Sequence, residues 1–215
     1  MKSTPHPAPA TTEQAESTTT RIARKTWSYI LALAAGLCWA GALLLLFLAD
    51  MHVEANPLAP QRVLFYVLVL AAGAMTFIPA AQWTGYEGLA LEGIGGMALL
   101  LYTLAFVPPP TDWLLALPDL PVYLLFIMAL FWSVSALVFP FVYALGYLVF
   151  KQRARRLDTR RAARQAHGIG LLVACLALLA ALRVLTLVSA LLVVLILAIA
   201  ELLLLSRVQV QQGAK

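Results

Sequence analysis

Long apolar runs dominate this sequence and constrain its fold more than any other feature. They lie at residues 27–49, 63–83, 85–107, 122–150 and 169–206, with short polar segments between them. A helix needs about 20 mainly apolar residues to cross the hydrocarbon of a bilayer, so the sequence predicts an all-α, polytopic transmembrane bundle. Composition agrees: 62% of the residues are apolar and 12% are charged, against about 45–50% and about 25% in soluble domains.

The last apolar run, 169–206, is too long for one span. At about 1.5 Å per residue it would form a helix of about 57 Å, nearly twice the hydrocarbon thickness. Two spans with a turn at Arg183 and Thr186 fit better and bring the total to six. Five spans are the alternative, because neither Gly nor Pro marks this turn. Five would leave Arg183 near mid-membrane, a costlier placement.

The basic residues predict the orientation of the chain. Most of the 15 Lys and Arg lie before the first apolar run or in the segment 151–168, as the positive-inside bias predicts for cytoplasmic segments. We therefore expect a multi-pass protein of a bacterial inner membrane with a cytoplasmic N-terminus. No aromatic residues interleave with the arginines, so the lipid bilayer is the expected partner and nucleic acid is not.

The same pattern divides the chain into segments. Residues 1–26, rich in Pro, Thr, Ala and Ser over their first 20 positions, predict a disordered cytoplasmic tail. A four-span region, 27–150, precedes the basic cytoplasmic segment 151–168. A transmembrane hairpin, 169–206, and a cytoplasmic tail, 207–215, complete the chain.

The stretch WTGYEGLALEGIGG, residues 83–96, joins the second span to the third. Thr84 and Glu87 fit the T-x-x-E capping box, in which each side chain accepts a hydrogen bond from a free amide of the first helical turn. A carboxylate there is also stabilised by the helix dipole. We therefore expect Thr84 and Glu87 to cap the third span. The glycines of this stretch predict a face on which another helix packs closely.

Two carboxylates lie within apolar runs, Glu92 and Glu201. An ionisable residue inside a membrane indicates a functional site, here one for a proton or a cation. With six spans, Glu92 and Glu201 would lie at about the same distance from the cytoplasm and could share that proton or cation. The alternative for Glu92 is a position among the headgroups, where a carboxylate costs little.

The basic segment predicts contact with lipid. A helix over residues 151–167 would place four arginines on one face, suited to anionic headgroups: Arg153, Arg156, Arg160 and Arg164. We place His52 and His167 in loops, without ligand partners at fixed spacing. Cys38 and Cys175 lie in apolar runs, and no H-E-x-x-H or G-x-S-x-G motif is present. The sequence therefore predicts no catalytic residue, metal site or cofactor.

Residues 21–137 resemble a group of small uncharacterised bacterial membrane proteins. The resemblance is carried by "RIAR" before the first span, "LAD" and "VE" in a short loop, "WTGYEG" and then "GIGGMALLLYTLAF". It implies about four spans with a W-x-x-E…GG turn between the second and third, and it implies no activity. Residues 138–215 depart from the group by adding the basic segment and the terminal hairpin.

Two functions from different classes fit these features. The first is a non-enzymatic accessory, assembly or scaffold subunit that packs on other membrane helices or forms a homo-oligomer. The second is a small transporter or channel component that uses Glu92 and Glu201. We find no internal repeat between residues 27–107 and 122–206 of the kind common in transporters, which favours the accessory subunit.

Overall fold

A computed structural model describes residues 11–48, 56, 58–108, 119–149 and 158–213, with side chains between residues 27 and 203. This part of the chain consists of helices and their connections and contains no strand. The helices are α1 (Thr11–Leu48), α2 (Pro60–Thr84), α3 (Gly88–Phe106), α4 (Leu120–Val149), α6 (Thr159–Ala181) and α7 (Leu187–Gly213).

Five of these helices, α1 to α6, are long and apolar enough to cross a membrane. The apolar part of α7, Leu187–Leu203, is shorter. Large apolar side chains are exposed on all of the helices, as expected where the surrounding solvent is lipid. The prediction of an all-α transmembrane bundle is confirmed, and the chain is a helical membrane protein.

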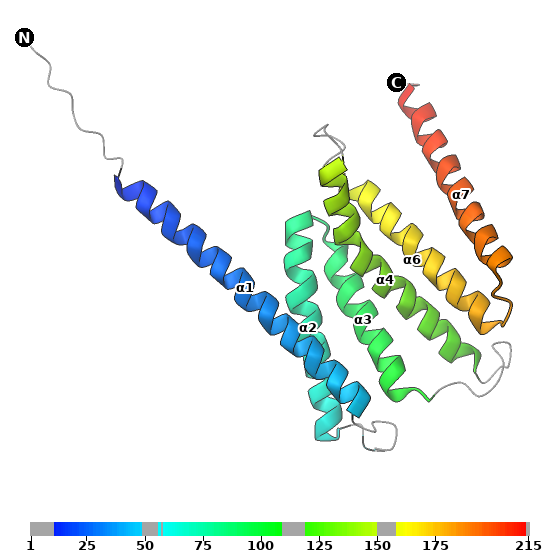
Figure 1. Cartoon of the computed structure of the whole chain (residues 1–215), viewed down its shortest axis with the longest axis horizontal. Coiled ribbons are helices and arrows are strands. Elements are labelled where there is room, and N and C mark those ends of the chain that lie inside the picture. The colour runs from blue at the N-terminus through cyan, green and yellow to red at the C-terminus, as the bar shows by residue number, and fades with distance from the viewer. Residues whose placement is uncertain (1–10, 49–55, 57, 109–118, 150–157, 214–215) are drawn as a thin grey trace, which may run out of the picture.

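The helices lie in a row in which each contacts the next: α1 on α2, α2 on α3, α3 on α4, α4 on α6, and α6 on α7 (Figure 1). The turn between α2 and α3 and the C-terminal end of α7 lie on one side of this row, which we call the α2–α3 side. The turn between α6 and α7 lies on the opposite side (Figure 1). Successive helices therefore alternate in direction, as in a protein that crosses a membrane repeatedly.

α4 is the centre of the row, because α3 and α6 pack on it from opposite sides. Where α3 meets α4, a Cβ added at Gly96 would lie 2.8 Å from the backbone nitrogen of Ser133. Where α6 meets α4, a Cβ added at Gly170 would overlap the hydroxyl of Ser135. Both contacts are close backbone approaches that small residues permit in membrane helices.

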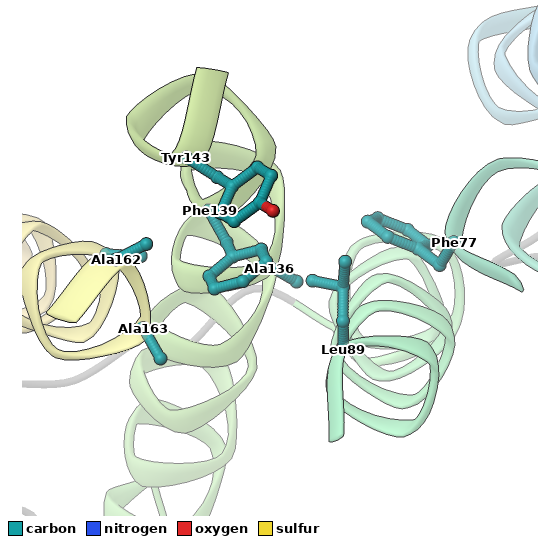
Figure 2. Packing of buried hydrophobic residues seen from close by; sticks show 8 residues of the cluster. Phe77, Leu89, Ala136, Phe139, Tyr143, Ala162 and Ala163 are labelled. Atoms are coloured by element: carbon teal, nitrogen blue, oxygen red, sulfur yellow. The ribbon is translucent and has the colours of Figure 1, made fainter. Parts of the chain in front are cut away.

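A cluster of buried side chains continues this packing toward the α2–α3 side (Figure 2). Phe139 and Tyr143 of α4 lie at its centre, with alanines of α6 on one side and Leu89 of α3 on the other. Phe77 of α2 completes the cluster, and a Cβ added at Gly93 of α3 would overlap its ring. The glycine-rich stretch is therefore a packing face, with Gly93 against α2 and Gly96 against α4.

Three helices extend further than the sequence analysis predicts. α1 begins at Thr11, so residues 11–26 are helical where we expected a disordered tail; residues 1–10 lie outside the description. α6 begins at Thr159, within the expected basic segment, and α7 continues to Gly213, through most of the expected tail. Once a helix is nucleated, each further residue adds a hydrogen bond at little cost, and the Glu, Gln and Ala after Thr11 are good helix formers.

Residues 182–186 turn the chain between α6 and α7, which is the division that six spans require. The amide of Val184 donates to the carbonyl of Leu179 (3.1 Å) and that of Arg183 to Ala180 (3.0 Å). This is the Schellman pattern, with Arg183 in the left-handed position at φ 57°. α7 then begins with a reciprocal cap, in which the side chains of Thr186 and Ser189 each accept from the other's amide.

The two glycines of α6 test the packing of α6 on α4. Gly170→Ala forces a Cβ into Ser135 and the carbonyl of Phe131, so we expect it to lower the free energy of unfolding by about 2 kcal/mol. Gly168→Ala is the matched control, because no atom lies within 4 Å of its added Cβ. It should leave stability unchanged or raise it by about 0.5–1 kcal/mol, since alanine favours helices. Unfolding in detergent micelles measures both; equal effects would contradict the close contact.

Candidate functional site

Three polar side chains meet on the α2–α3 side of the row: Tyr86, Glu92 and His167. The Tyr86 hydroxyl donates a hydrogen bond to Glu92 Oε1 at 3.0 Å. On the other side of the same carboxylate, His167 Nε2 lies 3.4 Å from Oε2. Glu92 belongs to α3 and His167 to α6, so this contact joins the two helices that pack on opposite sides of α4.

The turn between α2 and α3 positions Tyr86. Gly85, at φ 71°, ends α2 in the left-handed conformation, and its amide donates to the carbonyl of Ala81 at 2.8 Å. The carbonyl of Tyr86 accepts from the amide of Leu89. The Tyr86 ring packs 5.1 Å from that of Phe139 on α4. The phenol is thereby held between α4 and the first turns of α3, where its hydroxyl reaches Glu92.

The second nitrogen of His167 determines how the pair can be protonated. Nδ1 lies 2.7 Å from the carbonyl oxygen of Ala163, one turn earlier in α6. A carbonyl only accepts, so Nδ1 carries a proton. In a neutral ring Nε2 would then be an acceptor facing another acceptor, the carboxylate. A proton on Nε2 would make the ring an imidazolium, which can pair with the Glu92 carboxylate at this distance.

Glu92 and His167 are only partly buried. Their side chains are 23% and 33% exposed, and the ring of His167 lies 5.8 Å from that of Phe131 on α4. Both groups are therefore accessible from the surface of the bundle. A carboxylate and an imidazole are side chains that can each bind and release a proton.

Tyr86 is the titratable member of the cluster that lies in the turn outside the spans. Burial raises the pKa of its phenol above the usual value, and the hydrogen bond to Glu92 and the negative charge of Glu92 raise it further. The phenol thus remains a donor to the carboxylate over the whole physiological range.

The expected capping box does not form. Thr84 is the last residue of α2, and its buried hydroxyl donates to the carbonyl of Ala80 at 2.8 Å. Glu87 is at the N-cap position of α3, is exposed and makes no side-chain cap hydrogen bond. The prediction for Thr84 and Glu87 is wrong because α2 continues through Thr84 and Gly85 ends it, which separates Thr84 from α3. The box appears instead at Thr186 and Ser189.

The two carboxylates within apolar runs, Glu92 and Glu201, have different surroundings. Glu92 contacts Tyr86 and His167, whereas Glu201 of α7 lines a groove of about 680 Å³ between α4, α6 and α7. His167 lines the same groove, so it lies between Glu92 and the space that Glu201 borders. The hypothesis of a site at Glu92 and Glu201 therefore acquires a third member.

Of the four arginines expected on one helical face, the structure describes two, Arg160 and Arg164. Arg160 is exposed near the start of α6, and Arg164, one turn later, lines the groove between α6 and α7. Arg153 and Arg156 lie outside the described residues, as does His52. Asp158 caps α6 by accepting a hydrogen bond from the amide of Arg161 at 3.1 Å.

Sequence reasoning missed His167 and Tyr86 as members of the site. We placed His167 in a loop, but it lies inside α6. The signal was present: small residues recur at helical spacing after Asp158, at Ala162, Ala163, Ala166 and Gly170. They are all buried. No local pattern indicated Tyr86, because its role depends on how the turn folds back onto Glu92.

These observations define the class of the protein: a multi-pass helical membrane protein with a Tyr–Glu–His cluster near one end of its spans. In the described residues no group of three or more His, Cys, Asp or Glu side chains could hold a metal ion. Comparisons with protein families, with curated proteins and with solved structures found no match.

The titration of Tyr86 tests the cluster. Because its pKa is raised on folding, its contribution to stability is present below the unfolded value of about 10 and is lost as pH rises through the folded value. The phenolate absorbance of the chain minus that of Tyr86→Phe should therefore show a titration above pH 10. Glu92→Gln should lower this pKa only in part, since burial remains. A Tyr86 that titrates in its usual range would contradict the contact.

Proposed function

We propose that this protein is a non-enzymatic accessory or assembly subunit of a bacterial inner membrane, with its N-terminus in the cytoplasm. The supporting observation is the open row of helices: α1 at one end packs mainly on α2, and α7 at the other packs mainly on α6. The remaining faces of both helices are exposed along their apolar lengths. A partner membrane protein can therefore add helices at either end without disturbing α2 to α6.

The length of α1 supports the same proposal. At about 1.5 Å per residue it measures about 57 Å, well beyond the hydrocarbon thickness of about 30 Å. Its polar first part, TTEQAESTTTRIARK, extends away from the row (Figure 1). Such a helix can contact a partner in the cytoplasm as well as in the membrane.

Purification with a photo-crosslinking residue tests the accessory role. Placed at Leu195, an exposed position of α7, the crosslinker should join the protein to a larger membrane protein that also co-purifies stoichiometrically in mild detergent. The control position is Leu104, which is similarly exposed but on α3, inside the row; it should give mainly lipid adducts. A protein that purifies alone as a defined species and shows measurable ion flux would overturn the proposal.

A second candidate function, a proton-handling component of a transporter, is favoured by Glu92 and His167. Their contact lies beside the groove that Glu201 also lines. Proton transfer from Glu92 through His167 toward Glu201 is the path that this arrangement supports. Polar groups that line a cavity at membrane depth are typical of such paths.

Flux in proteoliposomes tests the second candidate. If the path operates, Glu92→Gln and His167→Gln should each abolish proton flux, because each removes a proton-binding group. Glu201→Gln should do the same at the other end of the path. Glu87→Gln is the control, since Glu87 is exposed and outside the cluster. Flux that is equal in all four variants would exclude this function.

A further inference from the structure

The groove between α4, α6 and α7 carries two opposite charges on facing helices. Arg164 lines it from α6 and Glu201 from α7. Among the residues that the structure describes, the two form no ion pair with each other or with another side chain. The Nε of Arg164 is buried and has no hydrogen-bond partner there. The two walls of the groove therefore carry opposite charges that do not pair with each other.

The charges lie at one end of the groove. His167 lies 14 residues before the last residue of α6, and Glu201 lies 14 residues after the first residue of α7. At about 1.5 Å per residue, both are about 21 Å from the turn at 182–186. Arg164 lies about one helical turn beyond His167. If the turn marks one edge of a hydrocarbon layer about 30 Å thick, these groups approach the other edge, where headgroups begin. That edge is on the α2–α3 side.

Apart from Gln165 and His167 near the charged end, the rest of the groove is apolar and lies deeper. Leu171 and Leu172 of α6 and Val194 and Leu197 of α7 line it between the charged end and the turn. Its volume of about 680 Å³ is within the range of sites that bind small molecules. An occupant must therefore be apolar along one part and charged at one end.

We propose that the groove binds one phospholipid whose headgroup carries a primary ammonium, such as a phosphatidylethanolamine. Its phosphate accepts hydrogen bonds from the terminal nitrogens of the Arg164 guanidinium, and its ammonium donates to Glu201. An acyl chain fills the apolar part between α6 and α7. The proposal does not depend on either function proposed above.

The charge arrangement selects this headgroup over other lipids. A purely anionic headgroup would satisfy Arg164 but place no cation opposite Glu201. A quaternary ammonium carries the charge but has no N–H to donate to the carboxylate. His167 does not supply the missing cation, because its Nε2 faces Glu92. A headgroup with both a phosphate and a primary ammonium is complementary to both walls.

Lipid binding to the purified full-length protein tests the proposal. We would measure affinity by native mass spectrometry for phosphatidylethanolamine, phosphatidylcholine and phosphatidylglycerol with identical acyl chains. Phosphatidylethanolamine should bind about tenfold more tightly than phosphatidylcholine, since it alone makes the charge-assisted hydrogen bond to Glu201. Glu201→Gln should abolish this preference, and Arg164→Gln should weaken the binding of all three lipids. Equal affinities for the three lipids would overturn the proposal.

Two variants separate loss of the site from loss of the fold. Glu201→Lys should change the preference from phosphatidylethanolamine to phosphatidylglycerol, a gain that misfolding cannot produce. Glu87→Gln, which removes an exposed carboxylate outside the groove, should leave all affinities unchanged. If Glu201→Lys keeps the original preference, Glu201 does not determine which headgroup binds, and the proposal fails.

The soluble headgroup distinguishes a lipid site from a site for free phosphate compounds. Phosphoethanolamine without acyl chains should compete at least about tenfold more weakly than the lipid, because it cannot fill the apolar groove. Competition as strong as that of the lipid would mean that only the charged end binds, and would contradict the lipid assignment.

Discussion

The packing of α3 and α6 on α4 depends on two glycines. Gly96 and Gly170 let the two backbones approach α4 at Ser133 and Ser135, where a methyl group would overlap α4 atoms. In a membrane the hydrophobic effect does not drive helices together, because lipid is as apolar as leucine, so close van der Waals contact at small residues provides much of the association energy. Larger side chains at these positions would move α3 and α6 away from α4.

The polar cluster follows from that packing. Glu92 lies one turn before Gly96 in α3, and His167 lies about one turn before Gly170 in α6. Both helices therefore present a polar residue beside α4, on the α2–α3 side of their contact with it. The distance of 3.4 Å between Glu92 and His167 requires that α3 and α6 both be drawn close to α4. The contact between Glu92 of α3 and His167 of α6 therefore depends on α4, which packs on both helices.

Much of the fold could be predicted from the sequence, because the length of each apolar run can be counted directly along the chain. Spans, the helical class and the division of residues 169–206 follow from hydrocarbon thickness and the cost of placing Arg183 in its centre. The turn itself was hard to recognise, since Arg183 occupies the left-handed position at which glycine is usual. Local motifs were less informative. The T-x-x-E pattern at Thr84 is not a cap, because Gly85 ends α2 directly after Thr84, so Thr84 belongs to α2 and not to the start of α3.

The candidate site could be predicted only in part, for a physical reason. Glu92 and Glu201 are visible in the sequence because a carboxylate inside an apolar run is costly. Their partners are not visible in this way: Tyr86 and His167 lie in polar surroundings of the sequence, and their contacts depend on tertiary packing. The structure places an imidazole, and not a second carboxylate, beside Glu92.

His167 links the two polar features of the α2–α3 side. Its Nε2 faces Glu92, while its ring also borders the groove that contains Arg164 and Glu201. When His167 carries a proton on Nε2, its positive charge and the negative charge of the Glu92 carboxylate cancel, and the pair contributes no net charge to the groove. Arg164 and Glu201 then set its polarity, one positive wall and one negative. Loss of Glu92 would leave either a lone acceptor or a cation at the border of the groove, so the two features cannot be altered independently at this residue.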